Sequence, residues 1–240
     1  MKFKKLPTKF ETLIPDKNIC ILGLQGSRSL GMAQKKDADW DIRGVYIEKN
    51  SKLLSLSKHK DVYESVNSED DEMDLVLYEL SKFFTLCLKG NPNVLSLLFL
   101  PDYFRLTDVG TQIIANRNLF LGERPIRAAF AGYAMSQILY LNRNHKFGNG
   151  KDTEKKNRKH IRHCFRLFDQ GKELLETGTL TLPLKTPKKY LDIANNCTEE
   201  EWRKLFESMN EEFKKTKSCL PTEPDTYLVN ELLLKIRNVI

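Results

Sequence analysis

Residues 21–31 read ILGLQGSRSLG and residues 37–47 read DADWDIRGVYI, and these two stretches decide how the chain is expected to fold. The first is an apolar run that ends in a Gly-Ser pair, which predicts a buried strand and a tight turn that opens a helix. The second is rich in β-forming residues, which predicts another strand. The expected order is therefore a strand over 18–24, a helix over 27–33 and a strand over 38–48.

Two acids of the second strand are expected to share one of its faces. Asp39 and Asp41 are two residues apart, and side chains along a strand alternate between its faces. Two carboxylates this close resist a common surface unless a cation lies between them, and Mg²⁺ prefers one or two carboxylates completed by substrate phosphates. The backbone N–H groups of Gly26 and Ser27, at a helix start, would attract an anion. The pattern therefore predicts a phosphate site beside a metal site.

Other motifs explain the same stretch less well. A phosphate-binding Walker A loop needs a lysine where this chain has Met32, so that motif is absent here. A calcium-binding EF-hand loop that starts at Asp37 would place Ile42 where glycine is required, and it would contain the β-forming residues Trp40 and Tyr46. The remaining alternative is an ordinary strand, turn and helix whose acids are merely solvated.

The motif also resembles a known family signature. Gly26-Ser27, then residues 28–38, then Asp39-Trp40-Asp41 is similar to the signature of the DNA polymerase β-like nucleotidyltransferases. Within that superfamily the chain resembles the predicted nucleotidyltransferases of bacteria and phages, including those associated with RNA ligases and RNA repair. Three further stretches match that group in order and extend the resemblance over most of the chain: GNPNVL at 90–95, GYAMSQ at 132–137 and KHIRHCFRL at 159–167.

The resemblance implies a fold and a reaction. The fold would be α+β, with a small mixed-sheet nucleotidyltransferase core over residues 1–118 and a helical region over 119–240 that closes over the active site. The reaction would transfer a nucleoside monophosphate from an NTP to a hydroxyl, with release of pyrophosphate, by a two-metal mechanism that uses Mg²⁺ or Mn²⁺. RNA is a possible acceptor under this reading, and the base and the acceptor stay open.

The same resemblance assigns roles to particular residues. Asp39 and Asp41 would hold the metal ions, and a third carboxylate from a neighbouring strand would join them and help to deprotonate the attacking hydroxyl. Asp74 is the candidate for that third carboxylate, with Glu64 as the alternative. Gly26 and Ser27 would bind phosphate, and two arginines would assist: Arg28 as a further cation on the phosphate, and Arg43 either as a contact to the acceptor or as a counter-charge to the acids.

A basic segment further along the chain is the second informative feature. Nine Lys or Arg residues stand against two acids between residues 143 and 166, within and before a helix expected over 152–177. Lys159, His163 and Arg166 share one face of that helix, which would suit a triphosphate or an RNA backbone. The alternatives are a solvated basic face and a histidine that serves the interior. Arg158 and His163 also fit the loose Arg-x4-His spacing of HEPN ribonucleases, which is common by chance.

Composition limits the remaining possibilities. The net charge of +7 over 240 residues favours polyanionic partners such as nucleotides or RNA. The five cysteines are scattered without a Cys-x-x-Cys pair, so neither zinc nor disulfides are indicated. No apolar run approaches the roughly 20 residues that span a bilayer, so we expect no membrane association and a cytoplasmic location.

Two classes of function follow from the sequence. The first is the metal-dependent nucleotidyltransferase, which the Asp39 and Asp41 pair favours. The alternative is a non-catalytic module that binds a nucleotide or RNA, either as an antitoxin-like partner or as an accessory factor in RNA repair. The oligomeric state is left open by the sequence.

Overall fold

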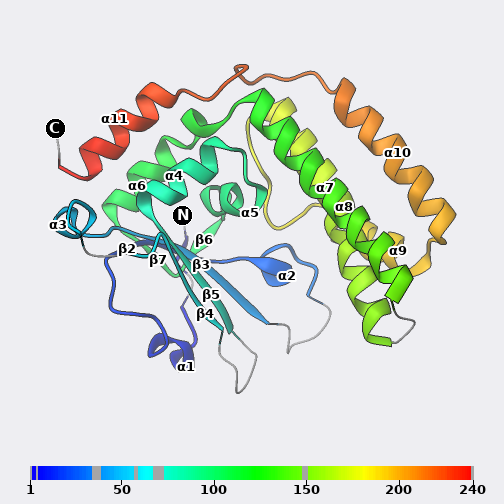
Figure 1. Cartoon of the computed structure of the whole chain (residues 1–240), viewed down its shortest axis with the longest axis horizontal. Helices are drawn as coiled ribbons and strands as arrows, with labels where there is room; N and C mark the ends of the chain where they lie inside the picture. Colours follow the sequence, from blue (N-terminus) through cyan, green and yellow to red (C-terminus); the bar gives the residue numbers. More distant parts are fainter. Residues whose placement is uncertain are drawn as a thin grey trace. The chain divides into compact units, whose positions relative to one another are not determined.

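The computed structural model describes residues 2–3, 5–33, 39–56, 59–66, 73–147 and 151–238 (Figure 1). It confirms the expected α+β class. The chain divides into two compact units, which are treated separately below. Unit 1 comprises Met1–Leu88, Asn93–Phe120 and Asp225–Ile240, and unit 2 comprises Lys89–Pro92 and Leu121–Pro224.

Unit 1 contains a mixed five-stranded sheet in the order β4-β5-β3-β2-β7. The two central strands, β3 and β5, run parallel, and the other neighbours pair antiparallel. A second, two-stranded sheet pairs β1 with β6 in parallel. The strands are β1 (Lys2–Phe3), β2 (Ile19–Leu24), β3 (Trp40–Tyr46), β4 (Val62–Val66), β5 (Met73–Glu79), β6 (Asp102–Tyr103) and β7 (Arg105–Leu106).

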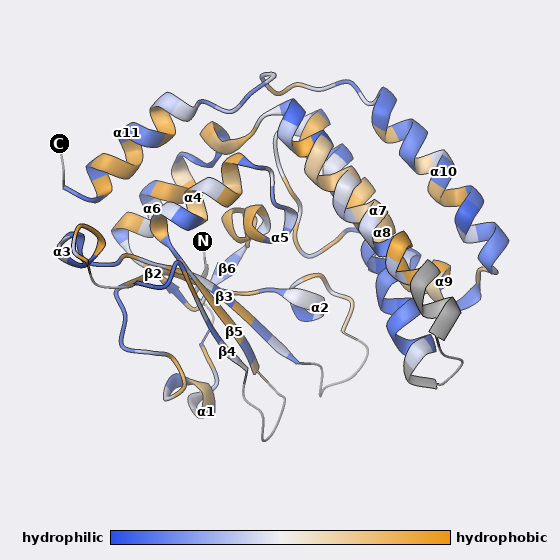
Figure 2. Ribbon diagram, in the orientation of Figure 1, coloured by the Kyte–Doolittle hydropathy of each residue, from blue (hydrophilic) through white to orange (hydrophobic). Residues whose placement is uncertain are grey.

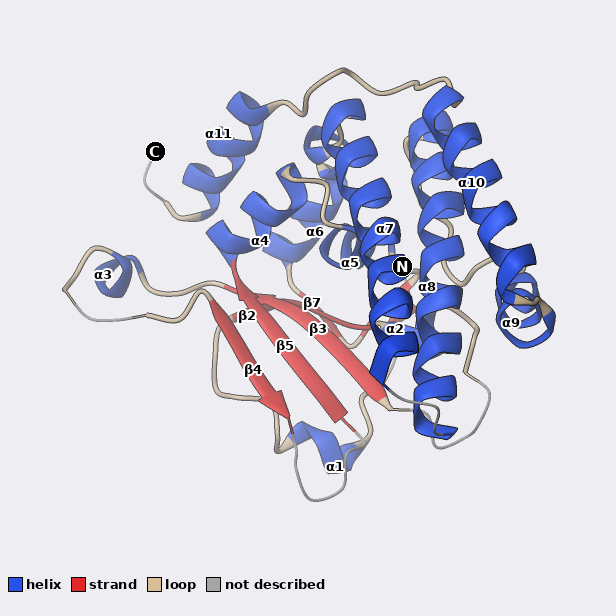
Figure 3. Cartoon of the chain, turned by 45° about the vertical axis from the view of Figure 1, so that its right-hand side comes forward, coloured by secondary structure: helices blue, strands red, loops and turns tan. Residues whose placement is uncertain are grey.

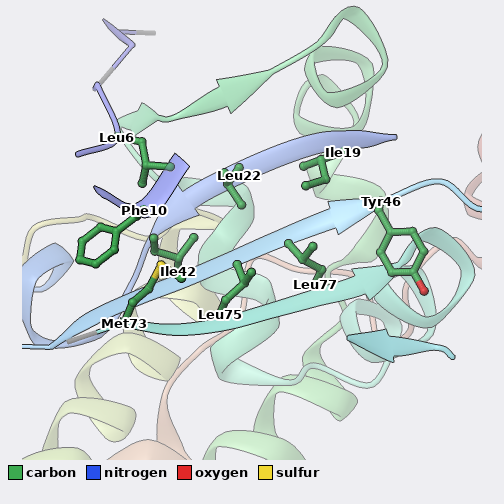
Figure 4. Close-up of a cluster of buried hydrophobic side chains, with 9 residues drawn as sticks. All are labelled: Leu6, Phe10, Ile19, Leu22, Ile42, Tyr46, Met73, Leu75 and Leu77. Carbon is green, nitrogen blue, oxygen red and sulfur yellow. The ribbon is translucent and has the colours of Figure 1, made fainter. Parts of the chain in front are cut away.

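The face of the sheet that carries Ile42 and Leu75 is part of the hydrophobic core. Both side chains are fully buried, and they cluster with Leu6 and with Phe10 of the short helix α1 (Thr8–Glu11), as Figure 4 shows. The registers of β3 and β5 pair Ile42 with Leu75. Because side chains alternate along a strand, the residues on either side of this pair point to the opposite face. That opposite face carries the acids of the site.

Helices and 3₁₀ turns complete unit 1. The helix α4 directly follows β5 and buries Leu80, Phe83, Phe84 and Cys87, and Phe84 meets Phe120 edge-on with ring centroids 4.9 Å apart. The other elements are α2 (Gly26–Ser29), α3 (Asn50–Leu53), α4 (Leu80–Leu88), α5 (Pro92–Leu95), η1 (Ser96–Phe99), α6 (Asp108–Ala115), η2 (Arg117–Phe120) and α11 (Thr226–Ile236).

The last helix is tied to unit 1 by a buried ion pair. Arg237, directly after α11, donates from Nη2 to Glu79 Oε1 at 2.6 Å and to Ser81 Oγ at 2.9 Å. The Arg237 side chain is 7% exposed and that of Glu79 is 2% exposed. The backbone oxygen of Arg237 accepts a bond from Asn50 Nδ2 at 2.8 Å. These contacts join the end of the chain to the end of β5.

Unit 2 is helical. Its two longest helices, α7 (Glu123–Phe147) and α8 (Lys151–Thr177), lie side by side (Figure 3). The helix α9 (Pro187–Asn196) also packs on α8, and α10 (Glu199–Lys215) begins with a capping box between Thr198 and Glu201. Figure 2 shows α10 as largely hydrophilic with a narrow apolar stripe, whose buried members are Trp202, Phe206, Met209 and Phe213.

Several sequence-based expectations differ from the structure in their limits. The helix expected over 27–33 is the single turn α2, which ends at Ser29. The strand expected over 38–48 begins at Trp40 and ends at Tyr46, so Asp39 lies just before it. The acidic run over 68–72 lies outside the described residues. In the described part of the chain, no helix is long and apolar enough to cross a membrane.

Candidate active site

The turn between β2 and α2 holds its glycine directly against an aspartate of β3. Gln25 donates its backbone N–H to the Asp41 carbonyl oxygen at 2.7 Å, which continues the pairing of β2 and β3 past the end of the strand. Gly26 then takes a positive φ of +64°, and a Cβ built on it would lie 1.7 Å from Asp41 Oδ2. Positive φ favours glycine in any case. Two constraints therefore favour glycine at residue 26: the positive φ of the backbone and the close approach of the Asp41 carboxylate.

A second contact supports the same turn from a distant part of unit 1. The Gln25 side chain is buried and lies 3.2 Å from Ser96 Oγ, which also donates to the Asn93 carbonyl oxygen at 3.0 Å. Asn93 belongs to the GNPNVL stretch at 90–95. Sequence patterns do not reveal Gln25 or Ser96, because a buried amide in a turn has no spacing pattern of its own.

Asp41 and Asp74 meet on the sheet. They occupy partner positions on the parallel strands β3 and β5 and share the face opposite Ile42 and Leu75. The side chains are 31% and 41% exposed, so both remain reachable from solvent. The structure thus brings together two of the three predicted carboxylates.

Arg43 contacts both of these carboxylates and is less exposed than either of them. Its Nη2 donates to Asp74 Oδ2 at 2.7 Å and lies 3.8 Å from Asp41 Oδ1. Its Nη1 donates to the carbonyl oxygens of Asp74 at 3.0 Å and Ile42 at 3.1 Å. The guanidinium is therefore fixed from two sides, with one positive charge near two negative ones. The sequence left two roles open for Arg43, a contact to the acceptor and a counter-charge to the acids. These contacts are those of a counter-charge.

The other predicted residues of this region lie at its edge. Asp39 is exposed and precedes β3 by one residue, and Ser27 is half-buried in α2. The Arg28 guanidinium lies over the Trp40 ring, 4.6 Å from its centroid. Glu64 is exposed on β4 and pairs with Val76 of β5. Because β5 separates β4 from β3, Glu64 lies one strand further from Asp41 than Asp74 does.

The carboxylates of Asp41 and Asp74 fit a divalent cation that a substrate helps to coordinate. Among the residues that the structure describes, no three His, Cys, Asp or Glu side chains are grouped closely enough to hold a metal ion by themselves. Mg²⁺ is usually held by one or two carboxylates together with phosphate oxygens and water, so two suffice. The guanidinium of Arg43 acts as a stand-in, because it shows that a positive charge is accommodated beside both carboxylates.

The predicted basic residues of α8 belong to unit 2. Lys159 is exposed, His163 is partly buried and Arg166 is only 6% exposed. Arg166 Nη2 lies 3.2 Å from His163 Nε2, and its Nη1 bonds to Gln170 Oε1. Burial lowers the pKa of Arg166 to about 10. His163 and Arg166 therefore form a mostly interior pair, with Lys159 on the surface of the same helix.

Burial and the neighbouring Arg166 lower the pKa of His163 to about 3, so the native state holds this ring neutral at pH 7. The unfolded chain binds the proton near pH 6.5 and the native state does not, so stability is lost as the pH falls from 6.5 toward 3. We expect the His163→Gln variant to lose less unfolding free energy than the wild type between pH 7 and pH 4.5. Urea unfolding at a series of pH values measures this, and parallel losses in the two proteins would contradict it.

Known proteins resemble this chain to different degrees. The model of a family described as "RNA repair pathway DNA polymerase beta family" matches residues 5–235. Among solved structures, a nucleotidyltransferase-like protein from Exiguobacterium sibiricum matches with 8% identity and a TM-score of 0.32, over 97% of this chain and 78% of that one. A search of curated proteins gave no match. The family match confirms the resemblance that the sequence motifs indicated.

Proposed function

Because the chain belongs to the RNA repair pathway DNA polymerase beta family, we propose that it transfers a nucleoside monophosphate from an NTP to a hydroxyl acceptor and releases pyrophosphate. RNA is the acceptor we would test first, since the family is described by RNA repair. One observation carries the proposal. Asp41 and Asp74 stand in register on neighbouring strands, beside the glycine turn and around a positive charge.

The proposed roles follow from these positions. Asp41 and Asp74 would hold Mg²⁺ or Mn²⁺ together with the triphosphate, and Asp39, exposed just before β3, would add a third carboxylate. When bound, the metal would stabilise charge on the phosphates and make the acceptor hydroxyl more acidic. Gly26 and Ser27 would approach the phosphates by their backbone N–H groups. A Cβ on Gly26 would collide with the Asp41 side chain. Arg28, stacked on Trp40, is the further cation on the phosphates.

The proposed step is a displacement at the α-phosphorus of the NTP. The acceptor oxygen forms a bond to the α-phosphorus, and the bond from that phosphorus to the bridging oxygen of the β-phosphate breaks. Pyrophosphate leaves with the electron pair. The carboxylate of Asp74 takes the proton of the hydroxyl, which is the role of a general base.

In unit 2 we propose a phosphate-binding role for the basic face of α8. Lys159 is exposed and would contact a triphosphate or an RNA backbone as a point charge. His163 and Arg166 would lie beneath the bound phosphate and add to this site from the helix interior; His163 Nε2 is 3.2 Å from Arg166 Nη2. Loss of RNA affinity in a Lys159→Ala variant, with a reduced salt dependence, is the measurement that bears on this part.

The central test is transfer of label from each α-³²P-labelled NTP to a pool of cellular RNA with Mg²⁺ or Mn²⁺. We expect wild-type protein to transfer label and Asp41→Asn to transfer about 100-fold less, a loss of about 2.7 kcal/mol of transition-state stabilisation. Asp16→Asn is the matched control, because Asp16 is an exposed acid of the same unit and should leave transfer unchanged. Equal transfer by wild type and Asp41→Asn would contradict the proposal.

A second candidate is the non-catalytic module that binds a nucleotide or RNA. It is favoured by the ion pair of Arg43 with Asp74, which engages one of the two carboxylates that a metal needs. Wild-type protein that binds an NTP or RNA but transfers no label to RNA, protein or small-molecule extract would support this candidate over the enzyme.

A further inference from the structure

Arg43 contacts both carboxylates of the proposed site. It comes from β3, two residues after Asp41, and therefore lies on the same face of the sheet. Its guanidinium nitrogen Nη2 is 2.7 Å from Asp74 Oδ2 and 3.8 Å from Asp41 Oδ1. A divalent ion held by the same two carboxylates would need to share this small space with a fixed positive charge.

The guanidinium is not held by charge alone. Its Nη1 donates to the carbonyl oxygens of Asp74 and Ile42, so the group is anchored to the backbone of both β5 and β3. The side chain is 19% exposed, which limits the solvent screening of its charge. Two anchored hydrogen bonds and a short ion pair make Arg43 a resident counter-ion of the site rather than a mobile surface charge.

We propose that Arg43 competes with a divalent ion for Asp41 and Asp74, and that it makes the site bind a metal–nucleotide complex in preference to the free ion. Without a triphosphate, the guanidinium offsets one of the two carboxylate charges and repels the ion. With a triphosphate, about four added negative charges restore attraction for a second and larger positive charge. This inference rests on the proposed function, since it assumes that these carboxylates are the metal site.

The test uses Mn²⁺ and three proteins: the wild type, Arg43→Gln and Arg43→Lys. Binding of free Mn²⁺, measured by electron paramagnetic resonance, should be about tenfold tighter in Arg43→Gln than in the wild type, which corresponds to about 1.4 kcal/mol. Arg43→Lys keeps the charge and should stay close to the wild type. Added non-hydrolysable NTP should tighten Mn²⁺ binding more in the wild type than in Arg43→Gln.

Stability supplies a second readout that does not need transfer. Removal of the guanidinium leaves the two carboxylates facing each other, so Arg43→Gln should unfold at a lower temperature in EDTA than the wild type. Mn²⁺ should recover more of that loss in Arg43→Gln than it adds to the wild type, because it binds the native state. A folded Arg43→Gln whose Mn²⁺ affinity is unchanged or weaker would overturn the inference.

The outcomes separate this inference from the proposed function. Tighter Mn²⁺ binding in Arg43→Gln without label transfer by any protein would support the competition and count against the enzyme. Label transfer by the wild type with equal Mn²⁺ affinity in all three proteins would support the enzyme and overturn the competition. Absence of Mn²⁺ binding in the millimolar range by all three proteins would also overturn it.

Discussion

Replacing Gly26 by alanine is expected to destabilise unit 1 and to abolish label transfer. The backbone at Gly26 has a φ of +64°, which costs an L-residue about 1–2 kcal/mol. The new Cβ would also lie 1.7 Å from Asp41 Oδ2 and 2.8 Å from Asp41 Cβ. Rotation of the carboxylate cannot remove the second contact, so strain of about 1–3 kcal/mol follows from overpacking. The total loss of unfolding free energy is then about 2–5 kcal/mol.

Gly178 provides a matched control for the backbone part of this effect. It has a φ of +65°, but a Cβ there would meet only Leu220 Cδ2 at 3.6 Å and Cys219 Sγ at 3.9 Å, which are ordinary contacts. Gly178→Ala should therefore lose about 1–2 kcal/mol and keep its transfer activity. Urea unfolding and the transfer assay measure both variants. A Gly26→Ala protein that matches Gly178→Ala in stability and activity would show that the Asp41 contact does not matter.

The central part of this site could be predicted from the sequence because its order is local. A buried strand, a Gly-Ser turn and acids at alternate positions lie within 30 residues, and period-2 geometry alone places Asp41 on a chosen face. The strand β2 and the helix α8 were confirmed close to their expected limits. Asp74 was expected on a neighbouring strand, and the structure places it directly opposite Asp41 in the register of β3 and β5.

Other features depend on partners that a sequence does not name. The pairing of Arg43 with Asp74 requires β5 to lie parallel to β3, and strand order is set by long-range packing. The burial of Arg166 depends on which side of α8 is covered, and spacing on one helix shows only that Lys159, His163 and Arg166 share a side. The packing of α11 within unit 1 likewise depends on long-range contacts, such as those with α4.

The strand β5 combines a site residue that could be predicted from the sequence with a long-range contact that could not. Its first residues carry Asp74 on the face of the site, and its last residue, Glu79, receives Arg237 from the end of the chain. The strand that supplies the second carboxylate is therefore held at one end by contacts that arise more than 150 residues later. Stability of the site and docking of α11 should be coupled through this strand.

Replacing Arg237 by methionine is expected to cause a large loss of stability, because it leaves the Glu79 carboxylate buried without a counter-charge. Glu79 is 2% exposed, and among the residues that the structure describes it would keep the N–H groups of Ser81, at 2.8 Å, and Glu48, at 3.4 Å. Removal of one partner of a buried ion pair costs about 3–5 kcal/mol. Urea unfolding monitored by circular dichroism measures the loss. Arg124→Met is the matched control, since its ion pair with Glu223 is exposed and worth about 0–1 kcal/mol.

The double variant Arg237→Met, Glu79→Gln identifies the origin of that loss. If the cost arises from an uncompensated buried charge, a neutral amide at residue 79 should restore a substantial part of it, and the two changes should be far from additive. If instead the cost arises only from lost packing at the end of α11, the second substitution should add a further loss. Additive losses, or a single Arg237→Met variant as stable as Arg124→Met, would refute the role of this pair in holding β5.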